Sequence, residues 1–189
     1  MKLTRLAISD VVEILPVQHG DDRGVFQETF RQDWFAEHVA DVTFVQENQS
    51  LSRSPGVIRG LHFQSNPHAQ GKLVRCVAGA IFDVAVDIRT GSASYGQWVS
   101  AELTAEAGNQ LWVPAGFLHG FCTLTADAIV AYKVTDYYNR DCDKGVQWND
   151  PDIAVAWPEI ANPSLLSPKD SQQPALKDLP PYFHHTTGA

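Results

Sequence analysis

The sequence predicts an all-β fold of the jelly-roll type, in which antiparallel strands form a sandwich or barrel. Short segments alternate apolar and polar residues with the two-residue period of a strand, most strictly from Ile81 to Ile88. Turn formers recur between such segments, at Gly91-Ser92, Gly108-Asn109 and Pro114-Ala115-Gly116. Only the segment 31–39 has helical spacing, which argues against a fold of alternating helices and strands.

The first third of the chain is expected to contain strands around one short helix. Val25–Phe30 alternates in polarity and predicts a half-buried strand, while Arg31–Val39 carries apolar residues at helical spacing. Thr43–Asn48 predicts a further strand. Gln46 and Asn48 are two positions apart in it, so both amides face the same side.

The middle of the chain contains the strongest strand signals. In Ile81–Ile88 one face carries Phe82, Val84, Val86 and Ile88, and the other carries Ile81, Asp83, Ala85 and Asp87. A second strong strand is expected in Ile129–Tyr138. After Asp150 prolines accumulate and the alternation fades, so residues 173–189 are expected to form an irregular tail. We expect one domain over residues 1–189, with its core in about 3–172.

The composition excludes several classes of protein. The 189 residues include 14 basic and 22 acidic side chains, and the net charge of −8 argues against nucleic acid as a partner. No apolar run is long enough to cross a membrane, and a cytoplasmic location is expected. The cysteines, Cys76, Cys122 and Cys142, are widely spaced and indicate neither a disulfide framework nor a zinc knuckle.

The stretch from Arg59 to Lys72 carries a candidate for proton chemistry. Folded back as two neighbouring strands, it would bring His62 close to Lys72. An imidazole takes up protons near neutral pH, and an ammonium stabilises the oxyanion that forms when a proton leaves carbon next to a carbonyl group. On a flat strand Arg59 and His62 would face opposite sides, so we expect either a bulge at Gly60 or a side chain that reaches around the end of the strand.

A second motif argues against a metal. The spacing Gly108-x5-Pro114-x-Gly116-x2-His119 resembles the second motif of the cupin jelly rolls, whose metal-binding members have His-x-His and a following Glu in the first motif. Here Gln64 replaces the second histidine, and no Glu lies between His62 and Lys72. Two imidazoles are fewer ligands than a transition metal usually takes, so no metal is expected.

A set of motifs extends in order over nearly the whole chain, about residues 3–172. They are Arg23-Gly24, Glu28, Gln46-Glu47-Asn48, Arg59 to Gln64, Gln70-Gly71-Lys72, Pro114 to Gly120, Tyr132-Lys133, Trp148-Asn149-Asp150 and Ser167-Pro168-Lys169-Asp170. Together they resemble the dTDP-4-dehydrorhamnose 3,5-epimerases. This resemblance implies a cupin-type jelly roll (double-stranded β-helix), no cofactor, and action on a dTDP-4-keto-6-deoxy sugar. It also implies a homodimer in which N-terminal strands cross to the partner.

The resemblance also implies roles for individual residues. His62 matches the base and Asp170 its carboxylate partner, Tyr132 matches the proton donor, and Lys72 matches the cation on the C4 oxygen. Further matches contact the nucleotide sugar, and His19 stands where the family often has an aromatic residue that stacks on the base. These further positions are Arg23, Glu28, Gln46, Asn48, Arg59, His119, Tyr137, Asp143 and Lys169.

Other functions are compatible with the same residues. An epimerase confined to C3, or a keto-isomerase acting on a related sugar, shares most of these motifs; retention of Tyr132 is expected to favour the double epimerase. A metal-dependent cupin oxygenase is disfavoured by Gln64. A non-catalytic sugar-binding jelly roll remains open, as does the role of Asp83, a buried carboxylate that could support His62.

Overall fold

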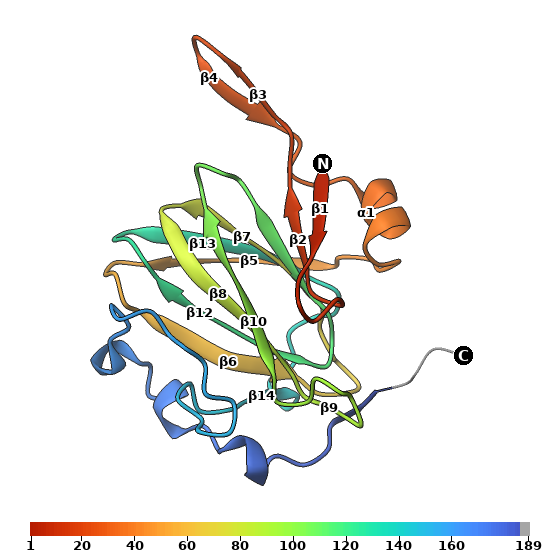
Figure 1. Cartoon of the computed structure of the whole chain (residues 1–189), viewed down its shortest axis with the longest axis vertical. Coiled ribbons are helices and arrows are strands. Elements are labelled where there is room, and N and C mark those ends of the chain that lie inside the picture. Colours follow the sequence, from red (N-terminus) through yellow and green to blue (C-terminus); the bar gives the residue numbers. More distant parts are fainter. Residues whose placement is uncertain (186–189) are drawn as a thin grey trace.

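The body of the protein consists of two antiparallel sheets packed face to face, as seen in a computed structural model that describes residues 1–185 (Figure 1). The sheets have six and five strands, and the predicted all-β jelly roll is confirmed. The first sheet contains, in spatial order, β1 (Lys2–Arg5), β2 (Val12–Leu15), β11 (Gln110–Val113), β7 (Lys72–Ala78), β13 (Ala128–Val134) and β5 (Gln46–Ser52). The second contains β10 (Trp98–Thr104), β8 (Ala80–Asp87), β12 (Phe117–Thr123), β6 (Ile58–Gln64) and β14 (Asp143–Gly145).

The alternation in β8 distributes its side chains between two apolar clusters. Ile81 and Ala85 join the cluster between the two sheets, whereas Val84 and Val86 join a cluster on the outer face of the five-stranded sheet. All four side chains are fully shielded from solvent. The predicted strand is therefore confirmed. It is buried on both faces because the C-terminal segment, residues 151–185, covers the outer face.

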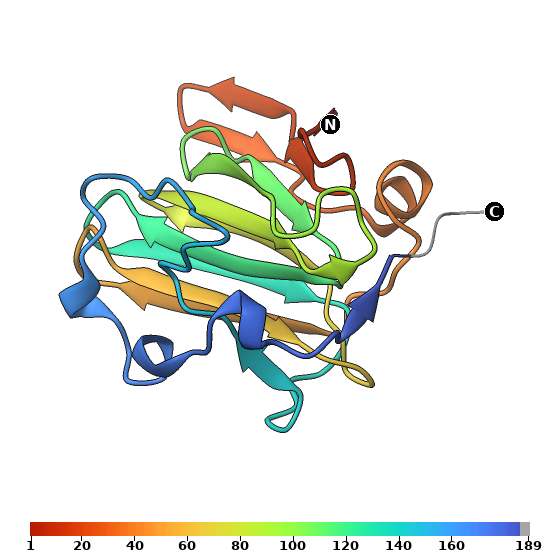
Figure 2. The same cartoon turned by 60° about the horizontal axis from the view of Figure 1, so that its bottom comes forward.

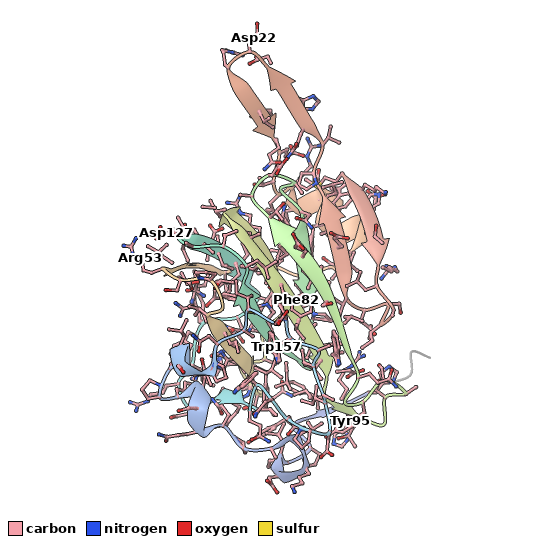
Figure 3. All side chains as sticks on the ribbon, turned by 60° about the vertical axis from the view of Figure 1, so that its left-hand side comes forward. Asp22, Arg53, Phe82, Tyr95, Asp127 and Trp157 are labelled. Atoms are coloured by element: carbon pink, nitrogen blue, oxygen red, sulfur yellow. The ribbon has the colours of Figure 1, made fainter. Side chains whose placement is uncertain are left out.

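The C-terminal segment packs across the outer face of the five-stranded sheet (Figure 2). The rings of Phe82 and Trp157 meet there at 6.2 Å in a T-shaped contact, and both are labelled in Figure 3. The expected irregular tail therefore folds against the body as far as residue 185. The C-terminal segment as a whole contains the 3₁₀ turns η1 (Pro163–Leu165), η2 (Asp170–Gln172) and η3 (Leu176–Asp178), and β15 (Phe183–His184), which pairs in parallel with β9 (Arg89–Thr90).

The outer face of the six-stranded sheet is covered by the predicted helix, α1 (Gln32–His38). Phe35 is its buried residue, and its ring packs edge-on against Trp112 of β11 at 5.3 Å. The helix lies one residue inside each predicted boundary. The predicted strand near Asn48 is also present, but it begins at Gln46 and continues to Ser52.

The strand predicted at Val25–Phe30 exists only in part and is not half-buried. Strands β3 (Gln18–Asp21) and β4 (Gly24–Gln27) form a hairpin that projects from the body (Figure 1). Val25 is 63% exposed and Phe26 is 73% exposed. Alternation correctly indicated a strand, but burial of one face requires a covering element, and this chain supplies none.

Two further expectations concern the whole chain: its division into domains and the absence of a membrane span. The single domain over 1–189, with its tail at 173–189, stays a prediction, and residues 186–189 lie outside the described part of the chain. None of the helices within residues 1–185 has the length and hydropathy needed to span a bilayer.

Candidate active site

A cavity of about 410 Å³ lies between the two sheets and is closed on one side by the C-terminal segment. Four of the side chains predicted from the sequence to carry the chemistry line it: His62, Lys72, Tyr132 and Asp170. They come from β6, β7, β13 and η2, so the fold brings together residues that are far apart in the sequence.

A bulge in β6 places Arg59 and His62 on the same side of the strand. His62 pairs with His119 of β12 and Arg59 pairs with Phe121, so three steps along β6 oppose two along β12. Gly60 has φ +124°, and a Cβ atom there would lie 2.6 Å from a backbone atom of β12. The predicted bulge is confirmed, and the close strand approach explains why a glycine occupies it.

His62 forms a hydrogen-bonded pair with Asp170, from 108 positions later in the chain. Its Nε2 lies 2.5 Å from Oδ1 of Asp170, and the side chains are 27% and 6% exposed, respectively. Burial raises the pKa of Asp170, but the hydrogen bond and charge of His62, with help from Ser167 and the backbone of Gly60, leave it below its usual value. The ionised carboxylate only accepts hydrogen bonds, so Nε2 of His62 donates to it, and in the neutral ring the lone pair is on Nδ1.

Lys72 reaches His62 from the opposite sheet. Its Nζ lies 3.5 Å from the backbone oxygen of His62. The sequence prediction placed the two on neighbouring strands, but β6 and β7 belong to different sheets and the connecting loop crosses between them. Burial lowers the pKa of Lys72 to about 8, against the attraction of Asp143 and Asp83. The residue is therefore cationic at neutral pH in a largely desolvated position.

Tyr132 stands on the other wall of the cavity from His62, since β13 belongs to the six-stranded sheet. It is half-buried, and its neighbour across the sheet is Asn48. Burial raises the pKa of Tyr132, although the charge of Arg59 and a hydrogen bond with Asn48 lower it. The phenol therefore keeps its proton at neutral pH, as a proton donor must.

His119 is held by the buried carboxylate of Asp83. Its Nε2 lies 3.0 Å from both oxygens of Asp83, which is fully buried on β8. The sequence suggested that Asp83 could support His62, and this was wrong. Asp83 faces the central sandwich next to β12, whereas the partner of His62 comes from the C-terminal segment.

Side chains predicted to contact the nucleotide surround a smaller adjoining cavity of about 190 Å³. Asn48, Asp143 and Lys169 line it, and Nζ of Lys169 lies 2.5 Å from Oδ2 of Asp143. Gln46 lies beside this group and donates to Oδ1 of Asn48 at 2.8 Å. The shared face predicted for the two amides is therefore confirmed.

Tyr138, to which the sequence analysis assigned no role, also lines this cavity. The predicted residue, Tyr137, lines neither cavity and is 63% exposed. The hydroxyl of Tyr138 donates to Asp143 at 3.1 Å, and its backbone N–H donates to Gln46. The two tyrosines are adjacent beyond the end of β13, where the strand period no longer indicates which one turns inward.

Arg23 and Glu28 are not brought to the cavity by their own chain. Arg23 lies at the hairpin tip, beside the Asp22 labelled in Figure 3, with its side chain 90% exposed and paired to Asp21. Glu28 forms an ion pair with Arg31 at 2.9 Å on the surface. His19 is exposed on the same hairpin.

The residue that replaces a cupin metal ligand has a structural role. The amide of Gln64 donates to the backbone oxygens of His68 and Tyr137 and accepts from the N–H of Asn139 at 2.7 Å. All of its polar atoms are thus engaged with loop backbone. Among residues 1–185 no group of three or more His, Cys, Asp or Glu side chains is arranged to hold a metal ion.

Comparison with known proteins identifies the family. The family model described as dTDP-4-dehydrorhamnose 3,5-epimerase matches residues 5–178. The chain belongs to this family. The dTDP-4-dehydrorhamnose 3,5-epimerase of Sinorhizobium fredii (strain NGR234) is 55% identical over 185 residues, covering 98% of this chain and 94% of that protein. The resemblance stated from the motifs is therefore confirmed, and the chain is an epimerase of the isomerase class.

Solved structures of the 3,5-epimerase family superimpose closely on this chain. The enzyme of Legionella pneumophila, in complex with dTDP-4-keto-L-rhamnose, matches with a TM-score of 0.92 and 41% identity over 98% of this chain and 99% of that one. A 3′-monoepimerase from Streptomyces bikiniensis, in complex with dTDP-quinovose, matches with a TM-score of 0.85 and 35% identity over 91% and 86%.

The monoepimerase corrects one expectation. It was also solved with a His-to-Asn and a Tyr-to-Phe substitution, separated along the chain by as many positions as His62 and Tyr132. An enzyme confined to one carbon therefore carries the same pair at the same spacing. Retention of Tyr132 does not by itself favour the double epimerase.

Proposed function

We propose that this chain epimerises dTDP-4-dehydro-6-deoxy-D-glucose at C3 and C5 to dTDP-4-dehydro-L-rhamnose, as part of dTDP-L-rhamnose biosynthesis. The observation that carries the proposal is the hydrogen-bonded pair of His62 and Asp170, which faces Tyr132 across a cavity that also holds Lys72. Base, acid and cation are the three groups that inversion next to a ketone needs.

The chemistry follows from the positions of these groups. Nδ1 of His62 takes the proton from C3 or C5, and the electron pair of the broken C–H bond moves into an enolate whose charge lies on the C4 oxygen. The ammonium of Lys72 stabilises this oxyanion. Asp170 fixes the ring of His62 and stabilises its protonated form. Tyr132 returns a proton to the opposite face of the carbon, because it projects from the opposite sheet.

Epimerisation at both carbons is favoured over a single site by sequence similarity. The chain is 55% identical to the Sinorhizobium fredii 3,5-epimerase but 40% identical to a dTDP-4-dehydrorhamnose 3-epimerase of Streptomyces niveus. The single-carbon activity is the second candidate, since the 3′-monoepimerase also superimposes on this chain.

Proton NMR of the dTDP-4-keto sugar incubated with the protein in deuterated water separates these candidates. We expect deuterium at both C3 and C5 and formation of the L-rhamno product. The Tyr132→Phe variant is expected to lose product formation at C5 first, and the His62→Asn variant to incorporate no deuterium. Deuterium at C3 alone in the unsubstituted protein would identify the single-carbon enzyme, and none at either carbon would refute an epimerase.

We further propose that two chains form a cytoplasmic homodimer in which the β3–β4 hairpin of each completes the nucleotide site of its partner. The hairpin exposes Val25 and Phe26, and its Arg23 lines neither of the two cavities described above. An exposed apolar strand carrying a residue expected to bind the substrate fits exchange between subunits.

A complementation experiment tests this exchange. Chains with His62→Asn and chains with Arg23→Ala are each expected to be inactive or weak. In the mixed dimer the intact cavity of the Arg23→Ala chain receives the intact hairpin of the His62→Asn chain. Mixing after brief denaturation is therefore expected to restore up to a quarter of the unsubstituted activity, since half of the dimers are mixed and each has one complete site. If Arg23 served its own chain, mixing would restore none.

A further inference from the structure

The cavity contains a second imidazole–carboxylate pair that takes no part in the proposed proton transfers, although the family resemblance implies that its histidine, His119, contacts the nucleotide sugar. His119 lies directly opposite His62 on the neighbouring strand, and both rings line the same cavity. In each ring Nε2 faces a carboxylate, that of Asp170 for His62 and that of Asp83 for His119. The pairs differ in access, because the side chain of His62 is 27% exposed and that of His119 only 8%.

The buried carboxylate determines which nitrogen of His119 carries a proton. Asp83 is fully buried, and within residues 1–185 its side chain has no hydrogen-bond partner other than His119. A buried carboxylate must accept a hydrogen bond, so Nε2 of His119 donates to it. Nδ1 forms no hydrogen bond to the described residues, and in this tautomer it offers a lone pair.

Few side-chain groups in this cavity can accept a hydrogen bond without also being able to donate one. Arg59, Lys72 and Lys169 supply only donors, the carboxylate of Asp170 is engaged by His62, and the hydroxyls of Ser50, Ser167 and Tyr132 can donate as well as accept. Apart from Nδ1 of His62, which is proposed to take the substrate proton, Nδ1 of His119 is the imidazole nitrogen that can accept from a hydroxyl group of the ligand. In a 4-keto-6-deoxy sugar such groups are the hydroxyls at C2 and C3. Inversion at C3 moves the hydroxyl there, while the C2 hydroxyl keeps its place on the ring.

We propose that Asp83 is a positioning residue that holds the ring of His119 so that Nδ1 accepts a hydrogen bond from the C2 hydroxyl of the sugar. The inference rests on the proposed function for the identity of the ligand. Its consequence is specificity: the site distinguishes a sugar with a C2 hydroxyl from one without it. A site built to pair with a hydroxyl is left with an unpaired polar atom when that group is missing.

Two measurements on the Asp83→Asn variant test the inference without requiring turnover. NMR of the ring nitrogens is expected to show His119 with its proton on Nε2 in the unsubstituted protein, and this preference is expected to be lost in the variant. Calorimetry is expected to show that the unsubstituted protein binds dTDP-glucose about fivefold to tenfold more tightly than dTDP-2-deoxyglucose, the value of one hydrogen bond. The Asp83→Asn variant is expected to bind the two equally.

Asp87→Asn is the matched control. Asp87 is equally buried on the same face of β8, but it pairs with Arg89 away from the cavity. This variant is expected to keep both the tautomer of His119 and the preference for the C2 hydroxyl. An unchanged tautomer or an unchanged preference in Asp83→Asn would overturn the inference, as would equal binding of both sugars by the unsubstituted protein. Failure of the proposed function would look different: no solvent exchange at C3 or C5, whatever the result of calorimetry.

Discussion

Replacing Lys72 with methionine is expected to stabilise the folded protein while it strongly reduces kcat. Lys72 is 9% exposed, and burial lowers its pKa from 10.5 to about 8. This depression corresponds to about 3 kcal/mol of unfavourable free energy for keeping the charged form in the folded state. Methionine has a similar length and no charge, so Lys72→Met removes that cost.

The pH dependence of stability gives the sign of the effect. The folded state binds the proton of Lys72 less tightly than the unfolded state, so unfolded chains carry more protons between pH 8 and pH 10.5. The penalty is complete below about pH 8 and disappears as the pH rises through this window. We therefore expect the free energy of unfolding of Lys72→Met to be about 3 kcal/mol higher than that of the unsubstituted protein at pH 7. The two free energies are expected to become equal near pH 10.5.

Urea denaturation at pH 7, 9 and 10.5, at one protein concentration, measures this difference. Lys177→Met, at an exposed lysine, is the control and is expected to show neither the gain nor the pH window. A Lys72→Met variant that is less stable than the unsubstituted protein at pH 7, or a gap that does not change with pH, would refute the reasoning. The same variant is expected to lose about 10² to 10³ in kcat, the usual effect of removing an oxyanion donor.

Three further predictions concern other parts of the fold. Asp87 has a pKa of about 2, because hydrogen bonds from Arg89 and two serines outweigh its burial. Asp87→Asn is therefore expected to reduce the free energy of unfolding by about 2 kcal/mol at pH 7, and this loss is expected to shrink as the pH falls from 4 towards 2. Urea denaturation at pH 7 and at pH 2 measures it. Gly60→Ala places a Cβ atom 2.6 Å from the backbone of β12 at φ +124°, so a lower melting temperature and displaced His62 resonances are expected, and a native-like spectrum would contradict this. Phe26→Asp, at a side chain 73% exposed, is expected to give monomers in sedimentation experiments without lowering the helix and strand content, whereas unchanged dimers would argue against exchange of the hairpin.

Local periodicity predicted much of the fold because it depends only on neighbouring residues. The alternation in Ile81–Ile88 correctly separated the two faces of β8, and the spacing of Trp34, Phe35 and Val39 located α1. The spacing of Arg59 and His62 also indicated an irregularity, either a bulge at Gly60 or a reach around the strand end, and the structure contains the bulge.

The pairing of distant segments was decided only by the tertiary structure. The sequence suggested that β6 and β7 are neighbours, but the sandwich places them in different sheets. Asp83 was expected near His62 and instead holds His119, because the position of a carboxylate depends on which strand packs beside it. Similarly, the strand predicted at Ile129–Tyr138 ends at Val134, so the two adjacent tyrosines do not follow strand alternation. Loop packing brings Tyr138 to the cavity and leaves Tyr137 in solvent.

The sequence by itself determined the strand pattern, the family and the residue types available for proton transfer. The tertiary structure decided which of these residues meet: His62 and Asp170 are 108 positions apart and come together only because the C-terminal segment folds back across the five-stranded sheet. The physical reason is that periodicity reports which face of an element is apolar. Contact between elements depends instead on how all of those faces are buried together.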